Sequence, residues 1–278
     1  MSSENKSPLF SMDIYSGTGT LLYAHRHTTS MELLEVLDGT IEVQIGTAFL
    51  EGVKGDFFYI PMGLVHSVTS GEGGKVRCLD FERSMIEENL ESIDEEILFM
   101  FEVQSRNKIF RFTKEHPFYQ ILKVYMNETY EEYASKDVCY KLPIRANIYL
   151  MVTALLRHYC AIRNEQDRNI YHNVLRLAPA ISYINASFVG KIYIEELSER
   201  VMVSADYFTK MFRDSIGKTP IDYINDLRIN HALAMLCETN ASIQEISEAT
   251  GFCNPNYFHK IFKQYMNCSP LAYRKASK

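Results

Sequence analysis

The sequence predicts an α+β fold in which strands and helices occupy different parts of the chain. Residues 10 to 83 consist of short alternating runs such as TIEVQIG, separated by glycines, and this pattern is typical of β-strands. From residue 85 onward the apolar residues recur at three and four positions, as in amphipathic helices. The C-terminal third contains two copies of one helical unit. The strands should therefore form one domain and the repeated helices another.

Composition is typical of a globular protein with ordinary cores. The chain has 278 residues, of which 46% are hydrophobic and 23% charged, enough for two domains that each bury a core. The start, MSSENKSPLF, has no apolar stretch, and no segment reaches the roughly 18 consecutive apolar residues of a membrane helix. The six cysteines include no CxxC pair, which favours reduced thiols. A cytoplasmic protein without a membrane segment is expected.

Charge is distributed unevenly along the chain. The net charge is −6, but residues 1–171 carry 17 Lys and Arg against 25 Asp and Glu, whereas residues 172–278 carry 12 against 10. The acidity belongs to the front part. A mildly positive back part can bind DNA if its basic residues share one face, so the negative total does not exclude a nucleic-acid partner.

The strand region contains the stretch HRHTTSME, residues 25 to 32, with two histidines one residue apart and a glutamate five positions later. A His-x-His pattern on a strand places both imidazoles on one face. Such a pair suits either a metal site or the polar wall of a pocket, and the stretch alone does not decide between them.

Two long amphipathic helices are predicted after the strands, over HPFYQILKVYMNETYEEYASK and LPIRANIYLMVTALLRHYCAI. A small strand domain cannot cover both faces of such a pair, and large exposed apolar stripes usually mark an interface. Residues 118–162 are therefore expected to form a homodimer with twofold symmetry. The polar stretch RNEQDRN at 163–169 is interpreted as an interdomain linker or a frayed helix end.

The internal repeat is the strongest signal in the sequence. SADYFTKMFRDSIGKTPIDY at 204–223 and NPNYFHKIFKQYMNCSPLAY at 254–273 match at an offset of 50. A short amphipathic helix, IEELSERV or IQEISEAT, and a tight turn precede each copy, so each unit reads helix, turn, helix. Ser204 and Asn254 are good N-caps for the second helices, and Gly217 and Asn267 stand where these helices should end with positive φ.

A rigid spacer is predicted between the two units. PIDYINDLRINHALAMLCE begins with proline and reads as a helix of about 18 residues, roughly 27 Å long. Two recognition helices held by such a spacer can enter successive major grooves on one face of B-DNA, which repeat about every 34 Å, if the DNA bends slightly or the helices tilt.

Residues 175–275 resemble the DNA-binding domain of AraC-type transcriptional regulators, in TPIDYINDLRINHALAML and in ISEATGFCNPNYFHKIFKQYMNCSPLAYR. The chain departs from the family pattern at three positions. Met202 stands where many members have a turn glycine, Tyr193 replaces the usual Ser or Thr cap, and Asn267 replaces a glycine. The first two departures should weaken the first unit by about 1 kcal/mol each.

Two groups of DNA-contacting residues are expected. The resemblance implies base-reading positions at Asp206, Thr209, Lys210, Asn256, His259 and Lys260. The basic residues Arg213, Lys218 and Lys263 are expected to contact phosphate instead. Lys210 and Lys260 can donate to guanine, and the amide of Asn256 can pair with adenine. The alternative for each residue is a solvated polar face, and Asp206 fits least well because phosphate repels an acid.

The strand region resembles a cupin domain. Gly19-x5-His25-x-His27-x4-Glu32-x6-Gly39 matches the first cupin motif, and Gly55-x5-Pro61-x-Gly63-x2-His66 matches the second, except that Ser70 replaces the usual asparagine. In cupins the four polar residues point into a small β-barrel and hold one metal, a set suited to Mn, Fe, Ni or Zn. The resemblance implies that His25, His27, Glu32 and His66 bind an effector, a divalent metal, or both.

Three functions compete for these residues: an effector pocket without metal, a metal that helps to hold the effector, and catalysis by a cupin oxygenase or isomerase fused to DNA-binding units. A non-enzymatic transcription regulator is expected, with a sensing and dimerisation domain at 1–165 and a DNA-binding domain at 172–278. Its partners would be double-stranded DNA, a small-molecule effector such as a sugar and, since activation is commoner in the family, RNA polymerase. Nothing in the sequence selects a sugar over another small polar metabolite.

Overall fold

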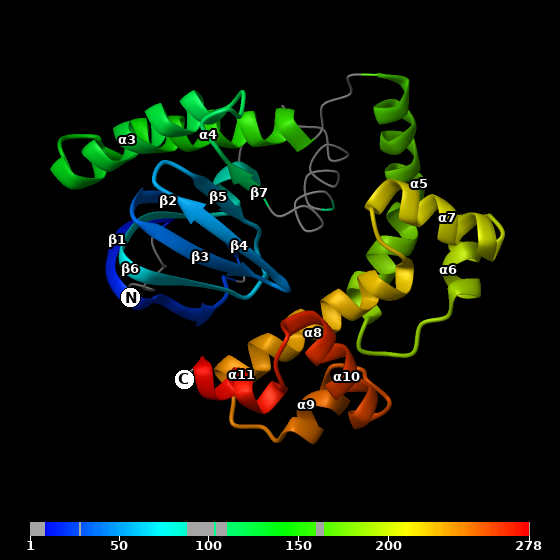
Figure 1. The fold of residues 1–278 in the computed structure, drawn as a ribbon. Coiled ribbons are helices and arrows are strands. Elements are labelled where there is room, and N and C mark those ends of the chain that lie inside the picture. Colours follow the sequence, from blue (N-terminus) through cyan, green and yellow to red (C-terminus); the bar gives the residue numbers. More distant parts are fainter. Residues whose placement is uncertain (1–8, 28, 88–102, 104–109, 160–163, 278) are drawn as a thin grey trace, which may run out of the picture.

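The computed structural model describes residues 9–27, 29–87, 103, 110–159 and 164–277, and these form a β-barrel, helices on its outside and a helical C-terminal region (Figure 1). The predicted α+β class is confirmed, with the strands in the N-terminal part and the helices after it. None of the helices within the described ranges is long and apolar enough to cross a membrane.

The barrel is one antiparallel sheet. Its strands are β1 (Phe10–His25), β2 (Ser30–Asp38), β3 (Thr40–Ile45), β4 (Ala48–Val53), β5 (Phe57–Ile60), β6 (His66–Glu82) and β7 (Phe110–Phe112). The order is β4-β3-β6-β2-β5-β7, and β1 pairs with β6. Because the long β6 pairs with β1, β2 and β3, the sheet curls into a nearly closed barrel.

Alternation along the strands builds two cores. In β2 and β5 successive residues face opposite sides, so Leu34 and Phe58 fill the barrel interior, whereas Leu33, Phe57 and Tyr59 face outward. The inner apolar cluster includes Val36, Ile41, Val43 and Ile60, and the buried Ser70 lies opposite Ile41. His25 and His66 lie where β1 ends and β6 begins, at one end of the barrel.

Two long helices cover the outward-facing core. The short α1 (Ser84–Glu87) follows the barrel, and α3 (Tyr119–Ser135) and α4 (Lys141–Tyr159) pack on the outside of the sheet. Their inner faces bury a set of apolar residues against the barrel, namely Leu122, Met126, Ile144, Ile148, Met151 and Leu155. The two predicted helices are confirmed as far as Tyr159, and residues 160–162 of the second prediction lie outside the described residues. Most of the apolar surface of these helices is covered by the barrel. The exposed remainder on α4 is a narrow outer stripe of Leu142, Ala146 and Leu150.

The C-terminal region is entirely helical. Its helices are α5 (Glu165–Ser187), α6 (Ile194–Arg200), α7 (Ala205–Ile216), α8 (Pro220–Glu238), α9 (Ile243–Ala249), α10 (Pro255–Met266) and α11 (Pro270–Ala276). The polar stretch at 163–169, interpreted as an interdomain linker or a frayed helix end, instead starts α5 from residue 164 onward. The Oδ1 atom of Asn164 accepts a hydrogen bond of 2.9 Å from the backbone N–H of Asp167. Residues 164–169 are thus a capped helix start, and residue 172 lies inside α5.

Both predicted helix-turn-helix units are present, as α6 with α7 and as α9 with α10. Ser204 and Asn254 cap the second helices with their side chains, and Gly217 and Asn267 end them with φ of 83° and 55°. Tyr193 provides no side-chain cap for α6. The predicted local signals at these positions are confirmed.

The turn inside each unit needs a left-handed residue. Met202 has a φ of 55° and Gly251 a φ of 85°. The backbone N–H groups of both residues bond one turn back, to Glu199 and Glu248, so the two positions are equivalent. The side chain of Met202 is 89% exposed and meets no obstacle, whereas a Cβ on Gly251 would lie 2.5 Å from the carbonyl oxygen of Val189. Packing therefore requires a glycine at position 251, whereas position 202 accepts a side chain.

Hydrogen bonds anchor the spacer helix α8 to the chain just after α5. Arg228, in the middle of α8, donates hydrogen bonds of 2.7 Å and 2.8 Å to the carbonyl oxygens of Phe188 and Gly190. These residues lie just after α5, on either side of the Val189 carbonyl that approaches Gly251. The spacer helix and the turn of the second unit thus share one anchoring point next to the first unit.

Candidate metal centre and DNA-binding surface

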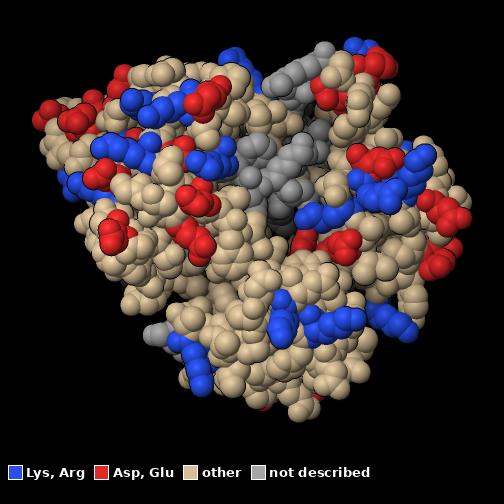
Figure 2. All heavy atoms as spheres, in the orientation of Figure 1, with Lys and Arg blue, Asp and Glu red and all other residues tan. Residues whose placement is uncertain are grey.

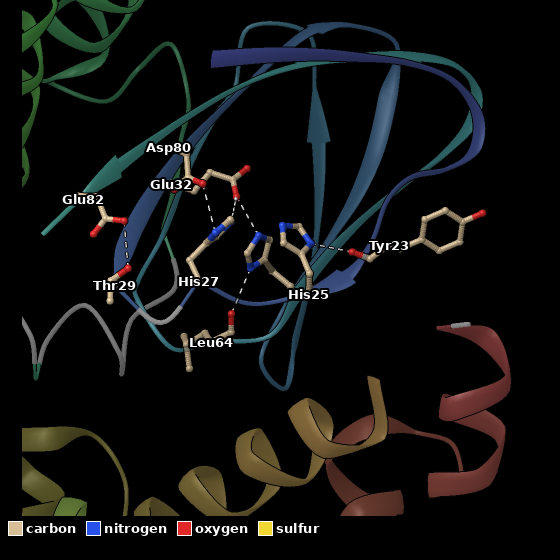
Figure 3. Close-up of polar contacts among 9 residues, drawn as sticks. Tyr23, His25, His27, Thr29, Glu32, Leu64, Asp80 and Glu82 are labelled. Atoms are coloured by element: carbon tan, nitrogen blue, oxygen red, sulfur yellow. Dashed lines mark hydrogen bonds and ion pairs between the residues drawn. The ribbon is translucent and has the colours of Figure 1, made fainter. Parts of the chain in front are cut away.

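The four polar residues of the predicted cupin site come together at one end of the barrel (Figure 3). His25 ends β1 and is paired across the sheet with His66, the first residue of β6. His27 follows β1, and Glu32 points inward from β2. One ligand atom of each side chain can be chosen so that all four lie within 4.8 Å of one another.

Glu32 is the common partner in the centre. Its Oε2 atom lies 2.9 Å from Nε2 of His66 and 3.3 Å from Nε2 of His27. Glu32 and His66 are buried, while His25 and His27 are half-buried at the barrel end. The Oε1 atom of Glu32 is buried and has no hydrogen-bond partner. The site therefore holds one carboxylate oxygen that the protein leaves unsatisfied.

All three histidines are oriented through their Nδ1 atoms. Nδ1 of His25 lies 2.8 Å from the carbonyl oxygen of Tyr23, and Nδ1 of His66 lies 3.1 Å from that of Leu64. A carbonyl only accepts, so both Nδ1 atoms carry the proton. Nδ1 of His27 lies 3.2 Å from the carboxylate of Asp80. The Nε2 atoms are thereby turned to the centre, where those of His27 and His66 lie against Oε2 of Glu32, and histidines oriented through Nδ1 in this way are typical metal ligands.

The ionisation of these groups follows from their surroundings. Burial alone would raise the pKa of Glu32, but the neighbouring His66 and the hydrogen bonds from His27 and His66 outweigh it and lower this pKa. The hydrogen bond to Glu32 raises the pKa of His27, against the effect of burial. Burial and the adjacent His66 ring lower the pKa of His25. The site combines an ionised carboxylate with a histidine whose neutral form is favoured.

The donor set fits a divalent metal. Three imidazole nitrogens and one carboxylate oxygen suit Zn, Fe, Ni or Mn. The oriented Nε2 atoms and the unsatisfied Oε1 of Glu32 are what a cation at this position would use. A bound metal would supply Lewis acidity and further positions for oxygen ligands.

Sequence reasoning missed two residues of the site. Asp80 lies against Nδ1 of His27, and the buried Cys78 lies near Glu32, where burial and the neighbouring carboxylate raise the pKa of its thiol. Both lie on β6, where Asp80 is the register partner of Glu32. The pairing register would have revealed Asp80, but register is not visible in a single sequence.

The residues predicted to contact DNA lie on the second helices of the two units. Asp206, Lys210 and Arg213 are exposed on α7, where Thr209 is half-buried. Asn256, His259, Lys260 and Lys263 are all exposed on α10. Lys218 differs, because it lies between α7 and α8 in an ion pair with Asp226. A phosphate contact by Lys218 would have to compete with that carboxylate.

The two units differ in charge. Residues 239–278 carry five Lys and Arg against two Asp and Glu, whereas residues 188–219 carry five of each. Figure 2 shows Lys and Arg over the lower part of the face, where α9 to α11 lie, with few acidic residues beside them. Phosphate attraction should therefore be stronger at the second unit.

Two family models match the chain, together over 151 of its 278 residues. A helix-turn-helix domain model matches residues 197–276, and a cupin domain model matches residues 12–82. The chain belongs to the AraC-type regulators with a cupin domain. The family predicted from the two sets of motifs is thereby confirmed.

Curated relatives that are named as transcription regulators match part of the chain. The HTH-type transcriptional regulator YdeC of Bacillus subtilis is 28% identical over 50% of this chain and 47% of its own length. The melibiose operon regulatory protein of Escherichia coli is 30% identical over 38% and 35%, and the lactose operon transcription activator of Staphylococcus xylosus is 28% identical over 34% of each. The chain spans no more than about half of these relatives.

The fold resembles that of ToxT from Vibrio cholerae. The two chains superimpose with a TM-score of 0.53 over 97% of this chain and 99% of ToxT, at 15% sequence identity. At that identity the likeness concerns the fold alone, a cupin barrel followed by two helix-turn-helix units.

Proposed function

We propose that the chain is a sequence-specific DNA-binding transcription regulator whose cupin barrel senses a small molecule. The observation that carries this proposal is the pair of helix-turn-helix units on one spacer helix, with seven of the nine predicted contact residues exposed on α7 and α10. The relatives named as transcriptional regulators support it. Acting on DNA, the protein would work in the cytoplasm.

The sensor is proposed to hold a divalent metal through His25, His27, Glu32 and His66. Support comes from the three Nε2 atoms that face one point and from the unsatisfied Oε1 of Glu32. Further coordination positions would be filled by oxygen atoms of the effector. This favours a small polar metabolite with neighbouring hydroxyl or carboxylate groups, and a sugar is one such molecule.

Activation is the proposed direction of regulation, with RNA polymerase as the protein partner. One relative is named as the activator of a lactose operon and another as the regulator of a melibiose operon. The second candidate function is a metal-dependent cupin oxygenase or isomerase, which would use the same four residues. Stoichiometric metal together with turnover of a substrate in the absence of DNA would favour the enzyme.

The DNA-binding proposal is tested at α10. After selection of a binding site from random duplexes, Lys260→Ala and Asn256→Ala should each weaken binding to the selected site by about 5- to 150-fold, or about 1 to 3 kcal/mol, and affect random DNA much less. The reason is that a contact to a base edge is lost only on the specific sequence. Fluorescence anisotropy with both duplexes at one fixed salt concentration measures the difference.

A matched control is Lys275→Ala, which removes a lysine of the same unit from α11 rather than from the recognition helix. It should change specific and random binding by the same small factor. Equal losses on both duplexes for Lys260→Ala and Asn256→Ala would contradict a base-reading role and leave only phosphate or solvent contacts.

A homodimer through α4 is also proposed, on a smaller surface than the sequence suggested. The outer stripe of Leu142, Ala146 and Leu150 is exposed, and Leu142 is 65% accessible. Leu142→Arg and Leu150→Arg should each weaken dimerisation at least tenfold, since a charge would replace an apolar contact. Sedimentation equilibrium of the full chain measures this, with Val138→Arg as an exposed apolar control outside the helix. A wild-type monomer at micromolar concentration would refute the dimer.

A further inference from the structure

The segment that bears two of the candidate metal ligands also contacts the DNA-binding region. His25, Arg26 and His27 are consecutive, and the two histidines face the metal centre. Arg26, between them, reaches the other way to Glu238, the last residue of α8. Its Nε lies 2.9 Å from Oε1 and its Nη2 lies 3.3 Å from Oε2 of that carboxylate.

The other histidine-bearing segment repeats this arrangement. His66 faces the metal centre, and the carbonyl of Leu64 holds its Nδ1. Val65, between them, is 1% exposed and belongs to the core of the second helix-turn-helix unit, together with Leu233 of α8 and Phe262 of α10. In both segments a residue next to a candidate metal ligand thus contacts the DNA-binding region: Arg26 contacts α8, and Val65 packs in the core of the second unit.

The barrel contacts the second unit but not the core of the first. Among the described residues of the first unit's core, none comes from strands β1 to β6. On the second unit, Nε2 of Gln44 donates a hydrogen bond of 3.2 Å to the hydroxyl of Tyr273. A cavity of about 400 Å³ beside this bond separates β3 and β6 from α11. The barrel therefore holds the second unit at a few points rather than over a closely packed surface.

We propose that Arg26 is a positioning residue that couples occupancy of the metal centre to the second helix-turn-helix unit. Coordination by His25 and His27 fixes the backbone on both sides of Arg26 and strengthens its ion pair with Glu238, so that α8 is held more firmly against the barrel. This inference rests on the proposed metal site.

The energetic reason is the entropy of the ion pair. Arg26 and Glu238 have side chains that are 27% and 49% exposed, and such pairs contribute little because two long side chains must be held in one geometry. Anchoring the chain on both sides of Arg26 removes part of that cost. By reciprocity, an intact pair must favour metal binding by the same factor with which the metal favours the pair.

Hydrogen exchange of the full chain tests the coupling. With saturating Zn²⁺, the backbone amides of residues 235–238 at the end of α8 should exchange about two- to fivefold more slowly than without Zn²⁺. A change of about this size is what the contribution of one exposed ion pair to stability would produce. In Glu238→Arg the slowing should fall below about 1.5-fold. The swapped variant, Arg26→Glu with Glu238→Arg, keeps the net charge and should restore it.

The matched control is Lys54→Gln, which breaks an exposed ion pair between two residues of the barrel domain, Lys54 and Asp38, and should keep the wild-type response. Any direct effect of the new arginine on α8 is present with and without Zn²⁺. It therefore cancels when the two exchange rates of the same variant are divided. Slowing of wild-type size in Glu238→Arg would overturn the proposal, and so would zinc binding to the wild type without slowing. Zinc stoichiometry, measured by titration on the same samples, shows separately whether the proposed metal site itself fails.

Discussion

The double substitution His27→Ala, His66→Ala is expected to lower the zinc affinity of the chain by more than about 100-fold. Substitution of a residue that merely supports a ligand typically costs 10- to 100-fold, and this variant removes two of the four ligands themselves. His25 and Glu32 would remain, too few to hold the ion. Isothermal titration with Zn²⁺, together with the metal content of the purified protein, measures the loss.

Two further variants keep this result interpretable. His172→Ala removes an exposed histidine of α5 and should bind zinc like the wild type. Asp80→Asn keeps all four ligands but weakens the hold on Nδ1 of His27, and an intermediate loss of about 10- to 100-fold is expected. Unchanged zinc binding in a folded double variant would refute the metal site and favour an effector pocket without metal.

Gly251→Ala is expected to destabilise the second helix-turn-helix unit by about 3 kcal/mol or more. The left-handed conformation costs an alanine about 1 to 2 kcal/mol. The new Cβ would in addition lie 2.5 Å from the carbonyl oxygen of Val189, and backbone on both sides must move to relieve that contact. Urea denaturation of the full chain, with hydrogen exchange of α10 as the probe, measures the change.

Substitutions at two other positions distinguish the cost of the left-handed conformation from the cost of the contact with Val189. Gly217→Ala also places alanine at positive φ, but no atom lies within 4 Å of its Cβ, so only about 1 to 2 kcal/mol should be lost. Met202→Gly, at the equivalent turn of the first unit, should stabilise the chain by about 0.5 to 1 kcal/mol because a strained residue is replaced. Equal losses for Gly251→Ala and Gly217→Ala would argue against the contact with Val189.

The helical region was predictable because its signals are local. Caps such as Ser204 and Asn254, the prolines that start α8 and α10, and the repeat itself depend on neighbours in the chain, and the structure has them where the sequence places them. The start of α5 was missed, since a polar first turn capped by Asn164 looks like a linker when its helix is not recognised.

The remaining features depend on pairing between distant residues. The register of β2 with β6 places Asp80 opposite Glu32, the partner of His27, and Glu238 approaches Arg26 across 212 positions of sequence. The apolar faces of α3 and α4 are visible in the sequence, but whether the barrel or a second subunit covers them is not. Such contacts follow from the packing of whole elements, which the periodicity of each element does not encode.

The anchoring of α8 by Arg228 bears on the DNA that this protein can read. Because Arg228 and Gly251 fix the spacer helix and the second unit against residues 188–190, the separation of the two recognition helices is set within the protein. One base pair inserted between the two contacted segments would displace one of them by about a tenth of a turn of B-DNA. Bending of the duplex would then have to absorb the displacement, at a cost that depends on the intervening sequence. Base pairs that touch no side chain would thus acquire a role in recognition.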